Sequence, residues 1–229
     1  KTLANTVDAI KELGAEVISL SGDITDPLKM IALRDLALSE YGQIDILVNN
    51  VGAGPKQSEK PPEHELGLTA SVWDGLYGQN LKPVVLMTEA VIPHMKQRKT
   101  GKVIHISSIA GRTSLSDKAL NSFVHPAYGA MKAALLNYFG NLAQELAPAG
   151  IRVNSVSPGP IYFKGGAWED IRAAMPEIYE GTVANIPAGR MGSPEEVCVQ
   201  VALLLSPLSG YTSGTNVVID GGFTKRIQF

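Results

Sequence analysis

The fold class is decided by the stretch Ile44-Asp45-Ile46-Leu47-Val48-Asn49-Asn50. Apart from Asp45, its residues are apolar as far as Val48. A short, nearly continuous apolar run is typical of a parallel strand that is buried on both faces, whereas a strand with one wet face alternates apolar and polar residues. Two asparagines then replace the apolar side chains with amides. The stretch therefore predicts a parallel sheet with polar groups where this strand ends.

Strand-like and helix-like segments alternate on both sides of this stretch. Further strands are predicted at residues 17–20, 102–107, 151–156 and 217–220. Helices are predicted at residues 3–13, 26–41, 71–97, 127–146 and 193–205, the last opening with the capping box Ser193 and Glu196. This alternation predicts an α/β fold, a parallel sheet with helices on both faces. No shift in composition marks a boundary, so residues 1–229 are predicted to form a single domain.

Polar or glycine-rich residues follow each predicted strand. These segments are Gly22-Asp23-Ile24, Asn49-Asn50-Val51-Gly52, Ser107-Ser108-Ile109-Ala110-Gly111 and Pro158-Gly159-Pro160-Ile161. The carboxyl ends of parallel strands lie at one edge of a sheet, where open α/β proteins bind their ligands. The sequence thus predicts one ligand site built from all of these segments.

Tyr128 and Lys132 are four residues apart on a predicted helix, so both side chains lie on one helix face. An ammonium near a phenol favours the phenolate and lowers the tyrosine pKa. A tyrosine tuned in this way can act as a general acid or base near neutral pH. By itself the same spacing is typical of an ordinary surface pair, so the other motifs decide its weight.

Those motifs follow one another in a fixed order: Asn-Asn-x-Gly at 49–52, Asn80, Ser-Ser at 107–108, Tyr-x-x-x-Lys at 128–132 and Pro-Gly at 158–159. Together they resemble the short-chain dehydrogenase/reductase family, including its 3-oxoacyl-reductase-like members. The resemblance covers essentially the whole chain, down to Asp220-Gly221-Gly222. It implies a Rossmann-type doubly wound parallel sheet that binds NAD or NADP.

The resemblance also implies a catalytic set, formed by Asn80, Ser108, Tyr128 and Lys132. Tyr128 would exchange a proton with the substrate oxygen, and Ser108 would hydrogen-bond that oxygen. Lys132 would lower the pKa of Tyr128 and hold the nicotinamide ribose, while Asn80 would support a water that links Lys132 to solvent. The implied reaction is the interconversion of a ketone and a secondary alcohol by hydride transfer, which is the chemistry of the cofactor.

Further residues are implied in cofactor binding. Asp23 would bind the adenine with Ile24 beside it, and the other contacts would come from Asn50, Val51, Gly52, Tyr128, Lys132, Pro158, Gly159 and Ile161. Other interpretations stay open: Asp23 as a turn residue, Gly52 as a bend, and Asn80 as a helix-surface amide. No metal site is expected, since the four histidines lack metal-ligand spacing.

The largest departure from the family is at the start of the sequence. The family begins with a strand and a glycine-rich turn, T-G-x-x-x-G-x-G, that binds the cofactor pyrophosphate. The present sequence opens inside the helix that should follow the second strand, so roughly the 30 residues of one βαβ unit are missing. Strand 17–20 would then lose its neighbours, and strand 44–48 would expose an apolar edge. We hypothesise that an N-terminal segment precedes these residues; the alternative is a truncation without a pyrophosphate site.

Smaller departures concern the site itself. Phe163 stands where the family often has a threonine that binds the cofactor. Tyr128 follows Ser108 by 20 positions, which predicts an insertion within residues 111–125. Residues 162–192 are expected to form a substrate cap, whose aromatic side chains would suit an apolar, medium-sized carbonyl compound or secondary alcohol. The residue that selects NAD or NADP lies about 20 positions past the glycine-rich turn, so this preference is not readable.

Composition narrows the function classes. Apolar residues make up 45% of the chain and the net charge is -2, which indicates a folded protein without a basic nucleic-acid groove. One cysteine and no membrane-spanning run indicate a cytoplasmic protein. The family resemblance implies a homotetramer or homodimer that acts on a small molecule. An alternative function is that of a non-catalytic relative, which would bind the cofactor or serve as a scaffold.

Overall fold

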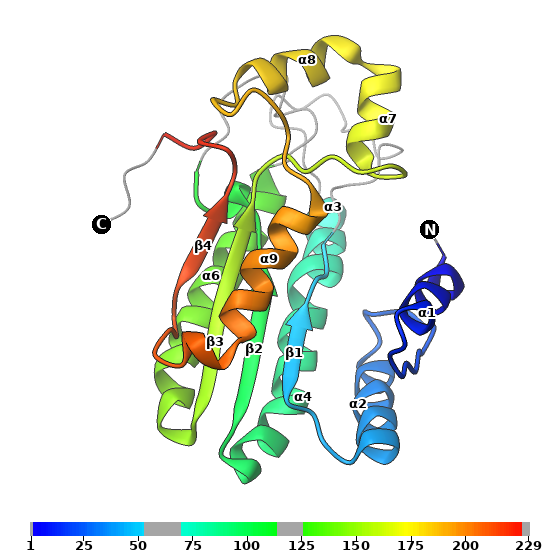
Figure 1. Cartoon of the computed structure of the whole chain (residues 1–229), viewed down its shortest axis with the longest axis vertical. Coiled ribbons are helices and arrows are strands. Elements are labelled where there is room, and N and C mark those ends of the chain that lie inside the picture. The colour runs from blue at the N-terminus through cyan, green and yellow to red at the C-terminus, as the bar shows by residue number, and fades with distance from the viewer. Residues whose placement is uncertain (1, 53–69, 114–125, 226–229) are drawn as a thin grey trace.

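The computed structural model describes residues 2–52, 70–113 and 126–225 (Figure 1). Its sheet has four parallel strands in the order β1-β2-β3-β4. They are β1 (Ile46–Asn49), β2 (Gly101–Ile106), β3 (Ile151–Pro158) and β4 (Asn216–Ile219). The register aligns one polar residue from each strand: Asn49, His105, Ser155 and Asn216. Residues aligned in this way lie on the same face of the sheet.

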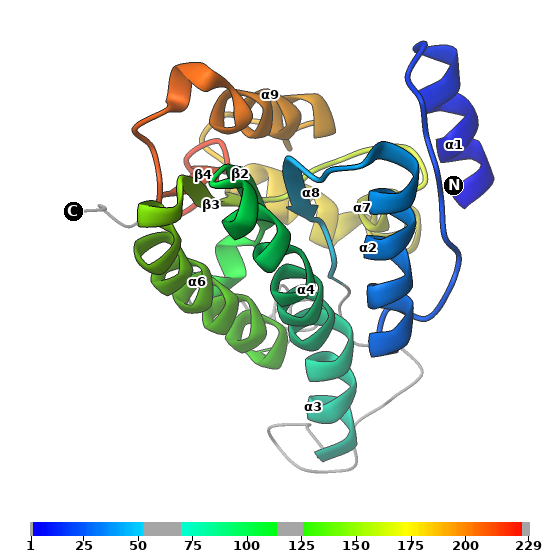
Figure 2. The same cartoon turned by 90° about the horizontal axis from the view of Figure 1, so that it is seen from below.

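Helices cover both faces of this sheet. Figure 2 shows α4 (Lys82–Arg98) and α6 (Pro126–Leu146) on one face and α9 (Pro194–Leu205) on the other. The largest buried cluster lies between the sheet and the α4–α6 layer, and it contains Val103, Leu135, Phe139 and Val153. The predicted α/β class, a parallel sheet with helices on both faces, is confirmed.

Local signals place several helix starts as predicted. The Asp26 side chain accepts a hydrogen bond from the Leu28 N–H, and α2 (Pro27–Tyr41) begins at the next residue. Ser193 and Glu196 form both bonds of the capping box at the start of α9. A side-chain oxygen at a helix start satisfies N–H groups that have no partner within the helix.

The predicted continuous helix at 71–97 is interrupted. It consists of α3 (Ala70–Leu76), a π-helical turn (Tyr77–Leu81) and α4. Beyond the carboxyl ends of the strands lie two cap helices, α7 (Ala167–Ala174) and α8 (Pro176–Ala184) (Figure 1). Short 3₁₀ turns occupy Ile109–Gly111, Ala147–Ala149 and Pro207–Ser209. Most of the predicted insertion, residues 114–125, lies outside the described residues.

The N-terminal part corrects one prediction. The helix α1 (Leu3–Glu12) is formed, but residues 17–20 are not a strand. A strand needs a neighbouring backbone for its hydrogen bonds, and no described strand lies beside these residues. β1 pairs on one side only, with β2, and its Ile46 and Val48 side chains are 43% and 42% exposed. The predicted exposure of an apolar edge at this strand is therefore observed.

Candidate active site

Lys132 lies at the centre of the site, on α6, and only 2% of it is exposed. Its Nζ donates hydrogen bonds to the carbonyl oxygens of Val51 (2.9 Å) and Ile106 (3.1 Å). These carbonyls follow or end the neighbouring strands β1 and β2, so the sheet edge fixes the ammonium. Burial lowers the pKa of Lys132 to about 8. An ammonium carries a third N–H, which stays available for a ligand.

Tyr128 lies one helical turn before Lys132, and the lysine Nζ is 5.7 Å from the centre of the tyrosine ring. Burial raises the pKa of the Tyr128 hydroxyl, and a hydrogen bond with Ser108 opposes this shift. The sequence predicted that Lys132 would lower this pKa. In the structure the Lys132 ammonium instead donates to the two backbone carbonyls. Burial is the largest influence on the pKa of Tyr128, and it raises that pKa.

Ser108 follows β2 and caps the 3₁₀ turn Ile109–Gly111, since its Oγ accepts a bond from the Ala110 N–H (3.2 Å). This turn packs directly on α6 through two glycines. A Cβ on Gly111 would lie 2.8 Å from the backbone of Lys132, and one on Gly129 would lie 2.7 Å from the Ala110 oxygen. The close contact explains how Ser108 and Tyr128, which are 20 positions apart in sequence, meet in space.

Asn80 is fully buried in the π-helical turn, and its Nδ2 donates to the carbonyl of Leu76 (3.1 Å). A Cβ on Gly52 would lie 2.9 Å from Nζ of Lys132 and 3.3 Å from Oδ1 of Asn80. The backbone after β1 thus lies beside both side chains, and glycine leaves the space next to them open. All members of the predicted catalytic set are brought together at this sheet edge.

The predicted cofactor residues lie along the same edge in two groups. Ile24 and Val51 line an apolar cavity of about 310 Å³ between α2, α4 and β1. Gly159 directly follows β3 and lies close to Asp220. A Cβ on Gly159 would be only 2.7 Å from the Cβ of Asp220. Pro158 ends β3, and Ile161 pairs with Gly192 in an isolated bridge. Asn50 and Gly52 are exposed directly after β1.

Two residues that the sequence analysis singled out, Asp23 and Phe163, make local contacts. The Oδ1 of Asp23 accepts bonds from both the N–H and the hydroxyl of Thr25 at 2.8 Å, so this carboxylate also holds a turn. These bonds lower the pKa of Asp23. Phe163 packs its ring against Gly166, where a Cβ would lie 2.7 Å from a ring atom. Phe163 thus fixes the start of α7.

Sequence reasoning missed three contributors to the site. The Ile106 carbonyl holds Lys132, and the Ser107 hydroxyl lies 3.5 Å from the Lys132 carbonyl oxygen. His105 is fully buried and stacks on Phe139 at 4.9 Å between ring centres. Burial, and next the charge of Lys132, lowers the pKa of His105 to about 3. A backbone acceptor leaves no side-chain signal, and a histidine within a strand can equally serve packing.

Comparison with known proteins decides the family. A family model described as "Enoyl-(Acyl carrier protein) reductase" matches residues 1–224. The chain is 36% identical to isoepoxydon dehydrogenase patN of Aspergillus clavatus over 188 residues, which are 82% of this chain and 66% of the relative. It is 31% identical to the 3-oxoacyl-[acyl-carrier-protein] reductase FabG of Escherichia coli over 222 residues, 96% of this chain and 84% of the relative. The chain belongs to the short-chain dehydrogenase/reductase family.

The fold agrees with solved structures of short-chain dehydrogenases. A 7α-hydroxysteroid dehydrogenase, solved with NADH and 7-oxo glycochenodeoxycholic acid, superposes with a TM-score of 0.81 at 27% identity. The match covers 98% of this chain and 81% of that one. The predicted Rossmann-type fold and enzyme class are confirmed: the chain is an NAD(P)-dependent oxidoreductase acting on ketone and alcohol groups. Within the described residues, no helix has the length and apolar character needed to cross a bilayer.

Proposed function

We propose that Tyr128 is the general acid and base of this dehydrogenase. The observation that carries the proposal is that Tyr128 hydrogen-bonds Ser108 and lies beside the ammonium of Lys132, with the two elements packed closely together. In ketone reduction the Tyr128 hydroxyl donates its proton to the carbonyl oxygen, while Ser108 hydrogen-bonds the same oxygen. In alcohol oxidation the proton moves in the opposite direction. Since burial disfavours the phenolate, the positive charge of Lys132 is needed to stabilise it.

The residues around Lys132 fit the nicotinamide ribose of NAD or NADP. Lys132 has a buried N–H beyond its two carbonyl bonds, and Gly52 leaves open space beside its Nζ. Asn50, Val51, Pro158, Gly159 and Ile161 line the adjoining sheet edge, and Asp23 and Ile24 extend it toward the adenine. When bound, the cofactor supplies or accepts the hydride. Asn80 lies beside Lys132, near the position where the relay water would bind.

The cap favours an apolar, medium-sized substrate. Tyr162 and Tyr179 meet edge to face at 6.0 Å, and the Arg172 guanidinium lies 5.3 Å from the centre of the Tyr179 ring. These contacts join the segment after β3 to α7 and α8 and place two aromatic rings in the cap. A cyclic ketone or secondary alcohol fits this chemistry.

We also propose that the protein is a cytoplasmic homotetramer or homodimer with one domain and a cap at 162–192. Large apolar side chains exposed around α9 support an interface there. They are Val199 at 63%, Leu203 at 49%, Leu208 at 90% and Tyr211 at 107% exposure. Apolar surface of this extent is typical of a contact with another surface.

The Tyr128→Phe variant tests the assignment. Wild type is assayed for oxidation and reduction of cyclic alcohols and ketones with NAD and NADP, in the full chain. Tyr128→Phe should lower kcat by about 10²- to 10⁴-fold, the usual contribution of a general acid or base. Cofactor affinity, measured by nucleotide fluorescence, should stay within about twofold, because the hydroxyl acts on substrate oxygen.

Tyr138→Phe is the matched control, because Tyr138 lies on the same helix but its hydroxyl faces Glu89 at 3.5 Å. It should keep wild-type kcat. Retained turnover in Tyr128→Phe would refute the role of this tyrosine. Cofactor binding with no turnover of any tested compound by wild type would favour the non-catalytic alternative.

A further inference from the structure

His105 is a buried polar side chain that the proposed proton transfer does not use. It lies in β2 and is fully buried. Its ring stacks on that of Phe139, with 4.9 Å between the ring centres and 6° between the ring planes. Both ring nitrogens lack a hydrogen-bond partner among the described residues. Buried polar groups are normally hydrogen-bonded, so this imidazole calls for an explanation beyond packing.

The His105 ring faces the helix that carries Lys132. Phe139, on which the ring stacks, follows Lys132 on α6 by about two helical turns. The residue after His105 in β2 is Ile106, whose carbonyl oxygen accepts a hydrogen bond from the Lys132 Nζ at 3.1 Å. The same strand and the same helix therefore hold His105 and Lys132 in one buried layer.

Lys132 is the charged group that acts on the His105 ring. Burial is the largest influence that lowers the pKa of His105, and the positive charge of Lys132 is the next. The other titratable side chains on α4, α6, β2 and β3 are not among the causes of this shift. They are Lys82, Glu89, His94, Lys96, Arg98, Lys102, Tyr128, Tyr138, Glu145 and Arg152.

Lys132 has no carboxylate partner that would stabilise its charge. No described aspartate or glutamate forms an ion pair with it, and its two acceptors are neutral carbonyl oxygens. Burial lowers the pKa of this lysine to about 8. A neutral polar group near the ammonium therefore affects how readily the lysine keeps its proton.

The unpartnered nitrogens leave the imidazole free to respond to that charge. A hydrogen bond to one ring nitrogen normally fixes which nitrogen carries the proton. The backbone of Asn49 acts on the ring less strongly than Lys132 does, without the geometry of a hydrogen bond, so no described group fixes the tautomer. The arrangement with a lone pair toward the ammonium has the lower energy. We propose that His105 is a positioning residue for Lys132, whose neutral ring turns a lone pair toward the ammonium and stabilises the charged lysine.

The consequence for catalysis rests on the proposed function, because there the charged Lys132 stabilises the Tyr128 phenolate. The effect on the lysine itself does not depend on that assignment. With a pKa of about 3, the His105 ring stays neutral while Lys132 titrates, so it adds no repelling charge.

NMR titration of the full chain with ¹³C-labelled lysine tests the proposal. The Lys132 Cε signal is identified as the one missing from Lys132→Arg. His105→Phe keeps an aromatic ring against Phe139 but removes the ring nitrogens, so the midpoint of the Lys132 titration should fall by about half a pH unit or more. His105→Asn, whose amide oxygen can face the ammonium, should give a midpoint closer to that of wild type. The alkaline limb of kcat/KM should move with the midpoint.

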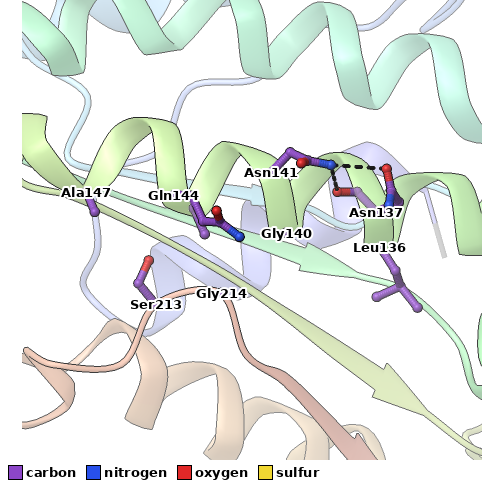
Figure 3. A pocket seen from close by; sticks show the side chains of 9 residues that line it. Leu136, Asn137, Gly140, Asn141, Gln144, Ala147, Ser213 and Gly214 are labelled. Carbon is purple, nitrogen blue, oxygen red and sulfur yellow. Dashed lines mark hydrogen bonds between the residues drawn. The ribbon is translucent and has the colours of Figure 1, made fainter.

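Two variants control for packing and for loss of an amide. Phe139→Leu loosens the same ring stack without removing a polar atom, so the Lys132 midpoint should stay at its wild-type value. Figure 3 shows Asn141 on α6, where its Nδ2 donates to Asn137. Asn141→Leu removes this exposed amide from the helix that carries Lys132 and should also leave the midpoint unchanged. Melting curves confirm that each variant is folded.

Three outcomes would overturn the proposal. An unchanged or raised midpoint in folded His105→Phe would mean that the ring does not stabilise the ammonium. A midpoint in His105→Asn as low as that in His105→Phe would mean that a polar group at this position has no effect. An equal fall in Phe139→Leu would assign the effect to packing. A lowered midpoint with an unmoved kcat/KM limb would support the role of His105 and count against that of Lys132 in the proposed function, so the two proposals fail separately.

Discussion

The two sides of the sheet centre differ sharply in packing, although their sequences look alike. Val103 of β2 and Val153 of β3 are fully buried, whereas Ile46 and Val48 of β1 are 43% and 42% exposed. Both regions carry apolar strand-like runs. β2 has a paired strand on each side, while β1 has one described partner. An apolar run therefore becomes core only where neighbouring elements complete it.

The predicted catalytic set lies where the two regions of this comparison meet. Lys132 and Asn80 are buried between β1, β2 and α6, and their contacts come from backbone that the sheet and π-helical turn hold in place. Asp23 belongs to the open side, where α1 contains no buried residue. The residues proposed for proton transfer thus lie apart from Asp23, the residue proposed to bind the adenine.

The largest expected effect comes from removing a core ring on the packed side. Phe139 is 2% exposed and stacks on His105, so Phe139→Ala should lower the free energy of unfolding by about 3–5 kcal/mol. Leu13→Ala, at a side chain 85% exposed, should change it by no more than about 0.5 kcal/mol. Urea unfolding followed by circular dichroism measures both. Equal effects would mean that the two regions are packed alike.

The pH dependence of kcat/KM is the next largest effect and reports on Lys132. Because burial lowers the pKa of this lysine to about 8, kcat/KM should fall about tenfold per pH unit above that value. The pKa of Tyr128 is raised, so its own ionisation would appear at higher pH. Lys132→Arg should lose the limb near pH 8, since a guanidinium stays charged. A flat wild-type profile up to pH 10 would contradict this assignment.

The contribution of Lys132 to folding stability changes with pH in the opposite direction to the activity. A loss of activity in this pH range can therefore be told apart from alkaline unfolding. The pKa of Lys132 is lowered from 10.5 to about 8 in the folded chain, so between these values the unfolded chain binds more protons. Stability linked to this group therefore rises with pH over this window. Activity should decline there while the lysine's contribution to stability increases.

The catalytic set was accessible from sequence because its members are side chains in ordered motifs. Tyr128 and Lys132 share a helix face by spacing alone, and Ser108 follows a strand that the apolar pattern predicts. The family resemblance added Asn80. The structure brings all four together, although their roles remain proposals.

What the sequence could not predict depends on contacts that are distant along the chain. The strand expected at 17–20 needs a neighbouring backbone, which local propensity does not report. The carbonyls of Val51 and Ile106 have no side-chain signature, so the direction of the Lys132 ammonium was unreadable. The π-helical turn around Asn80 keeps the same apolar spacing as the flanking helix, and it was therefore predicted as continuous helix.

His105 lies on the packed strand β2, and its burial makes protonation of the folded chain unfavourable. Its pKa is lowered from 6.5 to about 3, so below pH 6.5 the unfolded chain gains a proton that the folded chain does not. Stability from this group is complete above pH 6.5 and is lost as the pH falls toward 3. His105→Phe should reduce the stability difference between pH 7.5 and pH 5 by about 2 kcal/mol. Urea unfolding at both pH values provides the measurement, and an unchanged difference would show that His105 is protonated in the folded chain.

Ser193→Ala carries the smallest expected effect and tests a helix whose outer surface is exposed. The Ser193 Oγ accepts a hydrogen bond from the Glu196 N–H at 3.5 Å, and the Glu196 carboxylate accepts one from the Ser193 N–H at 2.9 Å. Removing the hydroxyl breaks half of this reciprocal cap, so the free energy of unfolding should fall by about 1 kcal/mol. Glu196 keeps its paired bonds with Arg190, at 2.7 and 2.9 Å, so the turn before α9 stays closed. A loss as large as that of Phe139→Ala would mean that this cap contributes as much to stability as a buried core ring, and no loss would mean that the Ser193 hydroxyl does not cap α9.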